Sequence, residues 1–336
     1  MKTVLFALVV CLLFISTTKS TVNSFRVAFY NCENFFDTLD DPHKNDNDFT
    51  PQGNRRWNSY KYYRKKNNLA KVINAIGEWN MPAIVGLCEI ENSMVLEDLC
   101  ANSLLGKFDY NFIHHESPDR RGIDVALLYR TSQVKVIEDK TFTVIFPESP
   151  NSRTRDILYA KVVLQNILDT LHIFVNHWPS RYGGHLETDA KRNYVAGYLN
   201  EIIHEVGIEK KILIMGDFND APLDQSLKDY LKSGNYNDQS NLINLMTSYQ
   251  EAGEGTHFHK GITEAWLPLD QMIVSRTLYE DNKGMSIKNQ EAKIFRKDWL
   301  LNSETSAPFR TYLGFKYAGG FSDHLPVYLD IVSDGQ

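Results

Sequence analysis

Two short polar segments carry residues that are suited to chemistry. Asp217 lies in GDFND (216–220), which follows the apolar run 212–215, and about a hundred positions later Asp323 and His324 lie in FSDHL (321–325), which precedes the apolar-rich run 326–332. Short apolar runs of this kind are typical of buried strands. A strand that ends in a carboxylate or an imidazole places these groups at a sheet edge, where desolvation is costly unless they bind or react with something. The two segments therefore indicate a functional site.

The same arrangement recurs along the chain. Six predicted strand ends or their flanks bring an acid, an amide or an imidazole, and ligands of open α/β sheets collect in crevices at strand ends. One such residue alone is more often a turn or helix-cap residue, but six predict a shared site. The residues are Asn31 and Glu33, Glu89 and Glu91, Asn176 and His177, Asp217 and Asn219, Asp270, and the pair Asp323 and His324.

The residue types in this set define the chemistry. Carboxylate and amide oxygens with little thiolate favour a hard cation such as Mg²⁺ or Mn²⁺, which would neutralise phosphate oxygens and stabilise the leaving oxygen. A histidine held by a carboxylate can take a proton from water. His177 and His324 permit one base and one donor to a phosphate oxygen. Zinc is less favoured because the sequence has neither a CxxC nor an HExxH pattern. The set predicts metal-dependent attack of water on a phosphate ester.

The elements that must position these residues follow from the apolar pattern. Short apolar runs predict strands, with helices between several of them. Two stacked mixed sheets flanked by helices are the simplest α/β architecture that covers this pattern. The strands are expected at 25–30, 83–87, 125–129, 157–163, 171–175, 212–215, 272–274 and 327–332.

Two segments show apolar residues at helical spacing. The second predicted helix covers 189–206, and the first lies between the first two strands, where Lys65 and Lys66 are largely off the apolar stripe. The stretch 55–66 mixes basic and aromatic residues, as a groove that tracks a nucleic-acid strand would. A solvated helix face explains Lys65 and Lys66 at least as well. The stripes are Leu69, Val72, Ile73, Ile76 and Trp79 in the first helix, and Tyr194, Val195, Tyr198, Leu199 and Ile202 in the second.

Composition narrows the class of protein. The chain has 336 residues, of which 43% are hydrophobic, and this fits one large domain, although two would also fit. The formal net charge of -6 disfavours strong, sequence-independent coating of nucleic acid. Any region that binds phosphate must therefore be local.

The amino terminus has the order of a secretory signal. Lys2 precedes an apolar stretch at 4–15, which gives way to small polar residues up to Ser20. The stretch is short for a membrane span, and no later segment is long enough to be one. We expect residues 1–20 to be a signal peptide and residues 21–336 to form the exported domain, with no stable membrane span. Its three cysteines allow at most one disulfide and are better explained as small buried residues.

Six motifs in order resemble the endonuclease/exonuclease/phosphatase superfamily. Together they span the chain from about residue 25 to its end. The resemblance implies a four-layer α/β sandwich that hydrolyses phosphoester bonds with a divalent metal. The stretch NHWPSR is similar to secreted extracellular nucleases and to pancreatic deoxyribonuclease, and departs from the abasic-site repair enzymes. The motifs are YNCENFFD (30–37), LCEIEN (87–92), NHWPSR (176–181), GDFND (216–220), LDQMIVS (269–275) and SDHLPV (322–327).

The resemblance also implies metal ligands. Glu89 would be the principal ligand of Mg²⁺ or Mn²⁺, with Asn31 beside it. Asp323 would be a further neighbour of the metal or of the histidine. Outside the resemblance, Arg153 and Arg155 precede a predicted strand and could clamp a substrate phosphate through bidentate contacts, with surface salt bridges as the alternative.

The remaining matched residues would carry the hydrolysis. His324 would be the general base and Asp270 its orienting partner. Asp217 and Asn219 would position the nucleophile and the phosphate, and His177 would donate to a phosphate oxygen.

We expect an exported, metal-dependent phosphodiesterase, and within that class a nuclease that cuts DNA or RNA. The alternative substrates are a small phosphodiester, a phospholipid head group or an inositol phosphate, which the acidic composition favours. A catalytically silent binding module on the same fold is the alternative from another class. The sequence leaves the oligomeric state open.

Overall fold

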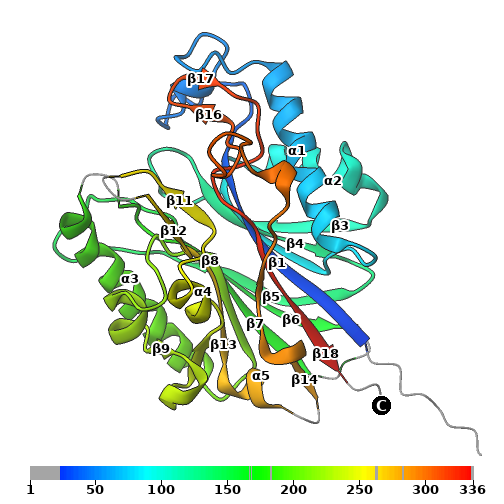
Figure 1. Cartoon of the computed structure of the whole chain (residues 1–336), viewed down its shortest axis with the longest axis vertical. Helices are drawn as coiled ribbons and strands as arrows, with labels where there is room; N and C mark the ends of the chain where they lie inside the picture. Colours follow the sequence, from blue (N-terminus) through cyan, green and yellow to red (C-terminus); the bar gives the residue numbers. More distant parts are fainter. Residues whose placement is uncertain are drawn as a thin grey trace, which may run out of the picture.

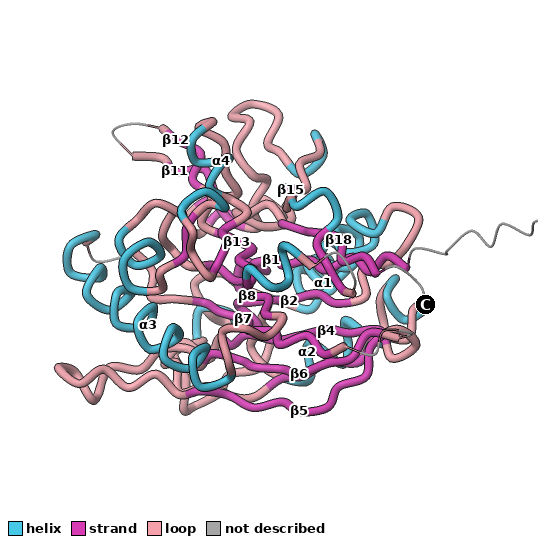
Figure 2. Tube along the Cα trace, turned by 90° about the horizontal axis from the view of Figure 1, so that it is seen from below, coloured by secondary structure: helices cyan, strands magenta, loops and turns pink. Residues whose placement is uncertain are grey.

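Two mixed β-sheets of seven strands each pack face to face in the part of the chain that the structure describes (Figure 1, Figure 2). The computed structural model describes residues 23–333 except 166, 168, 182–183, 262–263 and 282–283. The predicted signal peptide lies outside the described residues. Helices pack on the outer faces of the two sheets, which gives the four layers of the predicted α/β sandwich.

The first sheet has the strand order β14-β18-β1-β2-β4-β3, and β15 pairs with β18 outside this path. β1 and β2 run parallel, and the other neighbours run antiparallel. The strands are β14 (Met285–Ile287), β18 (Val327–Ser333), β1 (Asn23–Phe35), β2 (Ile84–Ile90), β4 (Asp124–Arg130), β3 (Tyr110–His114) and β15 (Lys293–Ile294).

The second sheet has the order β5-β6-β7-β8-β13-β10-β9. The pairs β7–β8 and β9–β10 are parallel, and the others are antiparallel. The strands are β5 (Val134–Phe142), β6 (Ile157–Leu164), β7 (Thr170–His177), β8 (Ile212–Asp217), β13 (Asp270–Ser275), β10 (Leu242–Asn244) and β9 (Ser233–Gly234).

Two short two-stranded ribbons and several helices complete the described fold. The ribbons are β11 (His257–His259) with β12 (Ala265–Leu267), and β16 (Tyr312–Leu313) with β17 (Lys316–Tyr317). The α-helices are α1 (Ser59–Gly77), α2 (Ser93–Ala101), α3 (His185–Val206), α4 (Thr247–Glu251) and α5 (Arg276–Glu280). The shorter helical turns are η1 (Asn47–Phe49), η2 (Leu104–Lys107), η3 (Ser226–Tyr230), η4 (Tyr236–Asp238), η5 (Lys288–Gln290) and η6 (Asp298–Leu300). Among the described residues, no helix has both the length and the apolar character that a membrane span requires.

The core lies in three layers of apolar contact. The central layer joins the inner faces of the two sheets, while α1 and α2 pack on the first sheet and α3 packs on the second. The sheets approach closely at Gly86 on β2, where an added Cβ would lie 2.8 Å from Cε of Met215 on β8. All eight predicted strands are present, and their continuous apolar runs are explained by burial on both faces.

Three details of the predicted first helix are wrong. α1 ends at Gly77, because Glu78 adopts a positive φ of 52°, and Trp79 beyond it is fully exposed. Lys65 and Lys66 are buried, although their positions off the apolar stripe predicted a solvated face or a groove. Lys65 reaches across to the segment 309–321, and Lys66 forms an ion pair with Asp98 at 2.8 Å. Long lysine stems can be covered in this way when their ammonium groups find partners.

The three cysteines that follow the predicted signal peptide, Cys32, Cys88 and Cys100, are free and buried, as predicted for small apolar residues. Burial raises the pKa of the Cys32 and Cys100 thiols to about 12, and raises that of Cys88 well above its usual value. Thiols of this kind are unreactive near neutral pH.

Candidate active site

Three predicted site residues form a row across the second sheet. In the strand register His177 on β7 lies opposite Asp217 on β8, and Asp217 lies opposite Asp270 on β13. All three are buried. Because each stands at the end of an apolar strand, the register alone brings an imidazole and two carboxylates to one sheet edge.

A loop from the first sheet delivers the second histidine to this row. The segment before β18 is fixed by Ser322, whose Oγ donates to the carbonyl of Asn31 at 2.7 Å and accepts from the backbone N–H of His324 at 3.1 Å. His324 Nδ1 then lies 2.6 Å from Asp270 Oδ2, and its Nε2 lies 3.8 Å from Asp217 Oδ2. The dyad predicted from the sequence is therefore formed, with Nε2 facing the row of acids.

Asp217 Oδ2 lies close to side-chain nitrogens from both sheets. The side-chain amide of Asn31 donates to it at 3.0 Å, and His177 Nε2 lies 3.8 Å away. The same His177 Nε2 lies 3.9 Å from Oε1 of Glu89 on the first sheet. Asn31 and Glu89 come from neighbouring parallel strands, since Asn31 is opposite Cys88 in the register. The facing edges of the two sheets thus supply one cluster.

Glu89 is held in an unusual backbone conformation. Its φ is +61°, and the pairing of β2 with β4 is irregular between Cys88 and Ile90. Its Oε2 accepts from the backbone N–H of Asn34 at 2.7 Å. A left-handed conformation is uncommon for a residue with a side chain, and such strain gathers at functional sites where the surrounding structure enforces it. The bulge therefore aims this carboxylate at His177.

The charges of the cluster are strongly coupled. Burial raises the pKa of Asp217 to about 7. Burial alone would lower the pKa of His324, but the carboxylates of Asp270 and Asp217 outweigh it and raise that pKa well above its usual value. Burial and the nearby positive charges of Arg155 and other groups lower the pKa of His177 well below its usual value. At neutral pH, His177 is thus a neutral imidazole, while Asp217 and His324 together retain a proton.

Asn219 and Arg155, one of the two predicted phosphate-binding arginines, bond the backbone at His177 and Trp178. The Asn219 side-chain amide donates to the carbonyl of Trp178 at 3.0 Å, and its own backbone N–H donates to Asp217 Oδ1 at 2.9 Å. Arg155 is buried and donates from Nε to the carbonyl of His177 at 3.1 Å, whereas Arg153 is exposed. Arg155 thus holds the end of β7, and Arg153 is the more accessible of the two arginines.

Asp323 lies beside His324 and His257, with ligand atoms of the three residues within 4.8 Å of one another, and its carboxylate is held by Arg310. Its Oδ2 accepts from Nη2 of Arg310 at 2.8 Å, and Arg310 Nε also donates to Glu33 Oε1 at 3.2 Å. Lys65 Nζ lies 3.9 Å from Glu33 Oε2. Glu33 has no role that its sequence position predicts, and Arg310 belongs to none of the motifs, because these pairing partners lie far apart along the chain.

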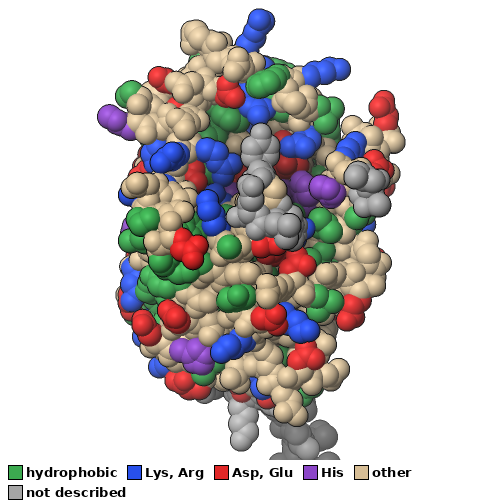
Figure 3. Space-filling model, turned by 90° about the vertical axis from the view of Figure 1, so that its left-hand side faces the viewer, with side chains coloured by type: hydrophobic (Ala, Val, Ile, Leu, Met, Phe, Trp, Pro, Cys, Tyr) green, Lys and Arg blue, Asp and Glu red, His purple; other side chains and the backbone are tan. Residues whose placement is uncertain are grey.

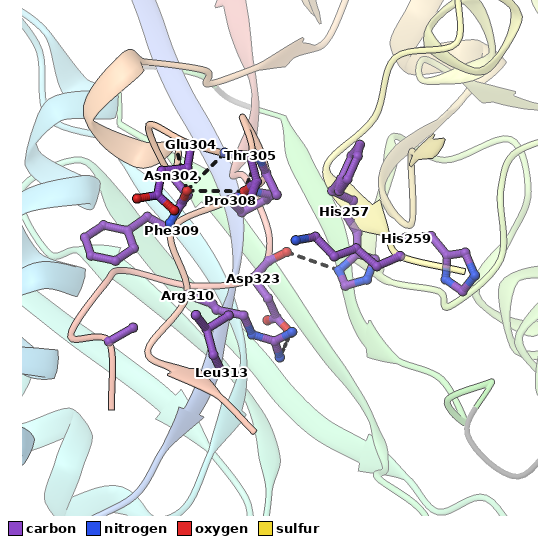
Figure 4. A pocket seen from close by; sticks show the side chains of 14 residues that line it. His257, His259, Asn302, Glu304, Thr305, Pro308, Phe309, Arg310, Leu313 and Asp323 are labelled. Atoms are coloured by element: carbon purple, nitrogen blue, oxygen red, sulfur yellow. Dashed lines mark hydrogen bonds and ion pairs between the residues drawn. The ribbon is translucent and has the colours of Figure 1, made fainter. Parts of the chain in front are cut away.

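His257 is a further neighbour that the sequence did not reveal. Its ring lies against that of His324, with centroids 4.6 Å apart, and its Nδ1 is 3.1 Å from the carbonyl oxygen of Asp323. Burial lowers the pKa of His257 to about 4, so it packs as a neutral ring. Figure 4 shows Asp323 between His257 and Arg310, on the wall of a cavity of about 360 Å³. β11 has three residues and no apolar run, so no sequence signal marked it.

The residues of the cluster suit a divalent cation. The ligand atoms available from Asp217, Asp270 and His324 lie within 4.8 Å of one another, and Glu89 and Asn31 add a carboxylate and an amide from the other sheet. Oδ1 of Asp270 is buried and has no hydrogen-bond partner among the described residues. Oxygen donors of this kind are those that Mg²⁺ and Mn²⁺ prefer. A cation held by Glu89, Asn31 and Asp217 would offset the burial of negative charge that raises the pKa of Asp217.

The chain belongs to the Endonuclease/Exonuclease/phosphatase family, whose sequence pattern it matches over residues 26–333. Members of this family are phosphoester hydrolases that use divalent metals. No curated protein sequence matches the chain.

Solved structures of the same fold include proteins with different activities. A humanized TDP2 from D. rerio shares 13% identity at a TM-score of 0.57, covering 92% of this chain and 98% of that one. The mannosyl-6-phosphatase of Bacteroides thetaiotaomicron shares 18% sequence identity at a TM-score of 0.56, and the match covers 91% of this chain and 99% of that one. The human Nocturnin catalytic domain, solved with a sulfate anion, shares 15% sequence identity at a TM-score of 0.54, and the match covers 92% of this chain and 93% of that one. At these identities the likeness shows the fold alone.

Proposed function

We propose that this protein is a divalent-metal-dependent phosphodiesterase that hydrolyses DNA or RNA by attack of water. The observation that carries the proposal is the dyad of Asp270 and His324, joined at 2.6 Å, whose free Nε2 faces the carboxylate cluster. Without metal, His324 and Asp217 retain a proton between them, and a cation bound beside Asp217 would favour the neutral imidazole. Its Nε2 lone pair could then take a proton from water while the carboxylate of Asp270 holds Nδ1. His324 is accordingly the base in this proposal, and Asp270 orients it.

The other residues bind the phosphate and the cation. Glu89 and Asn31 would hold the Mg²⁺ or Mn²⁺, with Asp217 between the two sheets. The bound cation would withdraw charge from the phosphate and from the leaving oxygen. His177 is neutral and would donate from Nε2 to a phosphate oxygen. The Asn219 side chain is held next to it by a hydrogen bond to the carbonyl of Trp178, the residue after His177.

Two cavities are lined by neighbours of the site residues, and this space favours a phosphodiester over a phosphomonoester. One cavity, of about 360 Å³, is lined by Asp323, the neighbour of His324 in the sequence. Another, of about 300 Å³, is lined by Arg155, which is bonded to the carbonyl of His177. A diester has a substituent on each side of its phosphorus, and the two cavities can take one each.

The acidic composition favours a second candidate. With a net charge of -6, a small phosphodiester, phospholipid head group or inositol phosphate would meet less overall repulsion than a polynucleotide does. The structural likeness to a mannosyl-6-phosphatase is compatible with a small phosphate ester.

One experiment separates these candidates. Purified protein is incubated with plasmid DNA, RNA and bis-(p-nitrophenyl) phosphate in Mg²⁺, Mn²⁺ or EDTA, alongside His324→Ala and the surface control His204→Ala. We expect metal-dependent nicking that is lost only in His324→Ala. Cleavage of the small diester alone would favour the second candidate, and no turnover of any substrate would contradict both.

Export through residues 1–20 is also part of the proposal, supported by the order of charged, apolar and small polar residues there. Amino-terminal sequencing of secreted protein tests it. A mature chain that begins near residue 21 is expected, and retention of residue 1 in secreted protein would contradict cleavage.

A further inference from the structure

A strongly basic cavity lies beside His177. Its volume is about 300 Å³, and no Asp or Glu lines it among the described residues. Hydroxyl groups from Ser152 and Ser180 accompany the cations and offer further donors. The excess is local, because the chain as a whole carries a net charge of -6. The four cationic residues that line the cavity are Arg121, Arg153, Arg155 and Lys191.

Two contacts place this cavity next to the catalytic residues. Arg155 donates to the carbonyl of His177 at 3.1 Å, and it also donates to the carbonyl of Trp178. The positive charges of Arg155 and Arg121 contribute, after burial, to the lowered pKa of His177. The cavity therefore adjoins the imidazole that binds a phosphate oxygen in the proposed function.

Arg153 and Lys191 are the cations of this cavity that keep donors for a ligand. Arg155 is occupied by the two carbonyls and by Asp119, whose Oδ2 lies 3.3 Å from its Nη1. Arg153 is exposed and bonds only the carbonyl of Pro150 among the described residues, while Lys191 Nζ donates to Ser152 Oγ at 3.2 Å. An exposed guanidinium and a half-buried ammonium that bonds a hydroxyl suit a phosphate dianion or diester.

We infer that this basic cavity binds a second phosphate group of the substrate, separate from the phosphate that is cleaved. The inference rests on the proposed function of the catalytic cluster and adds a requirement to it: the substrate carries at least two phosphates. A polynucleotide provides the second one in its backbone, and a polyphosphorylated small molecule provides it as a phosphomonoester. The chemistry at the cavity is the same for both sources.

The test compares substrates with and without the second phosphate. A dinucleoside monophosphate, which has only the scissile phosphate, is compared with the same compound carrying a terminal phosphate. The readout is the ratio of the two kcat/KM values, measured for the wild-type protein, for the double variant Arg153→Gln/Lys191→Gln and for Lys135→Gln. The control Lys135 is exposed on β5 opposite Val163, at the end of the sheet remote from Arg155.

We expect a wild-type ratio of about ten or more, which corresponds to about 1.4 kcal/mol of added binding. The ratio should fall to about one in the double variant and stay at the wild-type value in Lys135→Gln. Equal ratios in the wild-type protein and the double variant would overturn the inference. If the nucleotides are nevertheless hydrolysed, the proposed function is unaffected by that result.

A second arm covers failure of the nuclease function. If no nucleotide is hydrolysed, the same ratio is measured for an inositol monophosphate and an inositol bisphosphate. A preference for the bisphosphate that the double variant loses supports the inference with the small molecule as the source. No preference in either pair of substrates overturns it.

Discussion

Asp270 Oδ2 and His324 Nδ1 are 2.6 Å apart, although 54 residues separate them in the sequence. Asp270 is fixed by β13, where its backbone N–H also bonds Thr256 Oγ1 at 3.1 Å, and it is buried in the row of acids. His324 comes from the loop before β18 of the other sheet. The dyad therefore bridges the two sheets, and its geometry depends on their packing.

The first prediction concerns this bridge. Asp270→Asn keeps the volume of the side chain but removes the charge that holds the His324 tautomer and stabilises its protonated form. We expect kcat to fall by about 10³-fold or more, with the thermal midpoint changed little, as for other carboxylate-to-amide changes at such dyads. The matched control is Asp229→Asn, which is exposed. Hydrolysis by Asp270→Asn within a few-fold of wild type would show that the dyad has no catalytic role.

The second prediction concerns the cation. Glu89→Gln removes a carboxylate that the bulge of β2 directs at His177, so divalent metal should bind more weakly. We expect the Mg²⁺ concentration for half-maximal activity to rise by at least about tenfold. EDTA should abolish the activity of the wild-type protein. Glu97→Gln, on the exposed face of α2, serves as the control. An unchanged Mg²⁺ requirement in Glu89→Gln would remove Glu89 from the proposed ligands.

The row of His177, Asp217 and Asp270 could be predicted from the sequence for a physical reason. These residues end strands that are buried on both faces, and such strands appear as continuous apolar runs with an abrupt polar end. The partner His324 was assigned by resemblance, and the structure places its Nδ1 2.6 Å from Asp270 Oδ2. β5, by contrast, is largely exposed along its length and gave no apolar signal.

The loops around the site could not be predicted in the same way. His257 lies in a three-residue strand, and Arg310 lies in a loop, so neither belongs to a periodic pattern. Lys65 is buried because the segment 309–321 folds over α1, a contact between residues about 250 positions apart. Helical periodicity describes only which face a helix turns to the sheet, and Lys65 is covered from another side.

The third prediction follows from the burial of Lys65. Its Nζ donates to Thr311 Oγ1 at 2.7 Å and to the carbonyl of Phe321 at 2.6 Å, beside the buried Glu33. Lys65→Met leaves these acceptors and part of the Glu33 charge unpaired, so the free energy of unfolding should fall by about 3 kcal/mol. Lys71→Met, exposed on the same helix, should change it by about 1 kcal/mol or less. Denaturant unfolding checks both, and equal small effects would contradict the buried network.

The fourth prediction concerns the dependence of stability on pH without metal. Burial raises the pKa of Asp217 from an ordinary value of 3.8 to about 7, and the pKa of its partner His324 is also raised. The folded state therefore binds protons more tightly than the unfolded state, so stability falls as pH rises through this range. Burial also raises the pKa of Glu91, to about 8, and this contributes a further loss of stability as the pH rises. His177 and His257, whose pKa values are lowered, act in the opposite sense only up to the ordinary histidine value of about 6.5. In EDTA the thermal midpoint should therefore fall between about pH 7 and about pH 8.

The variant Asp217→Asn isolates the part of this slope that the active site contributes. The amide carries no charge at any pH, so the variant should lose less stability across the same pH range than the wild-type protein, with the Glu91 contribution remaining. Saturating Mg²⁺ should likewise flatten the wild-type slope, because a cation beside Asp217 favours the ionised carboxylate. Thermal melts at several pH values, with EDTA or Mg²⁺, measure both effects. A wild-type midpoint that rises with pH in EDTA would show that the buried carboxylate is ionised at less cost than the geometry of the site implies.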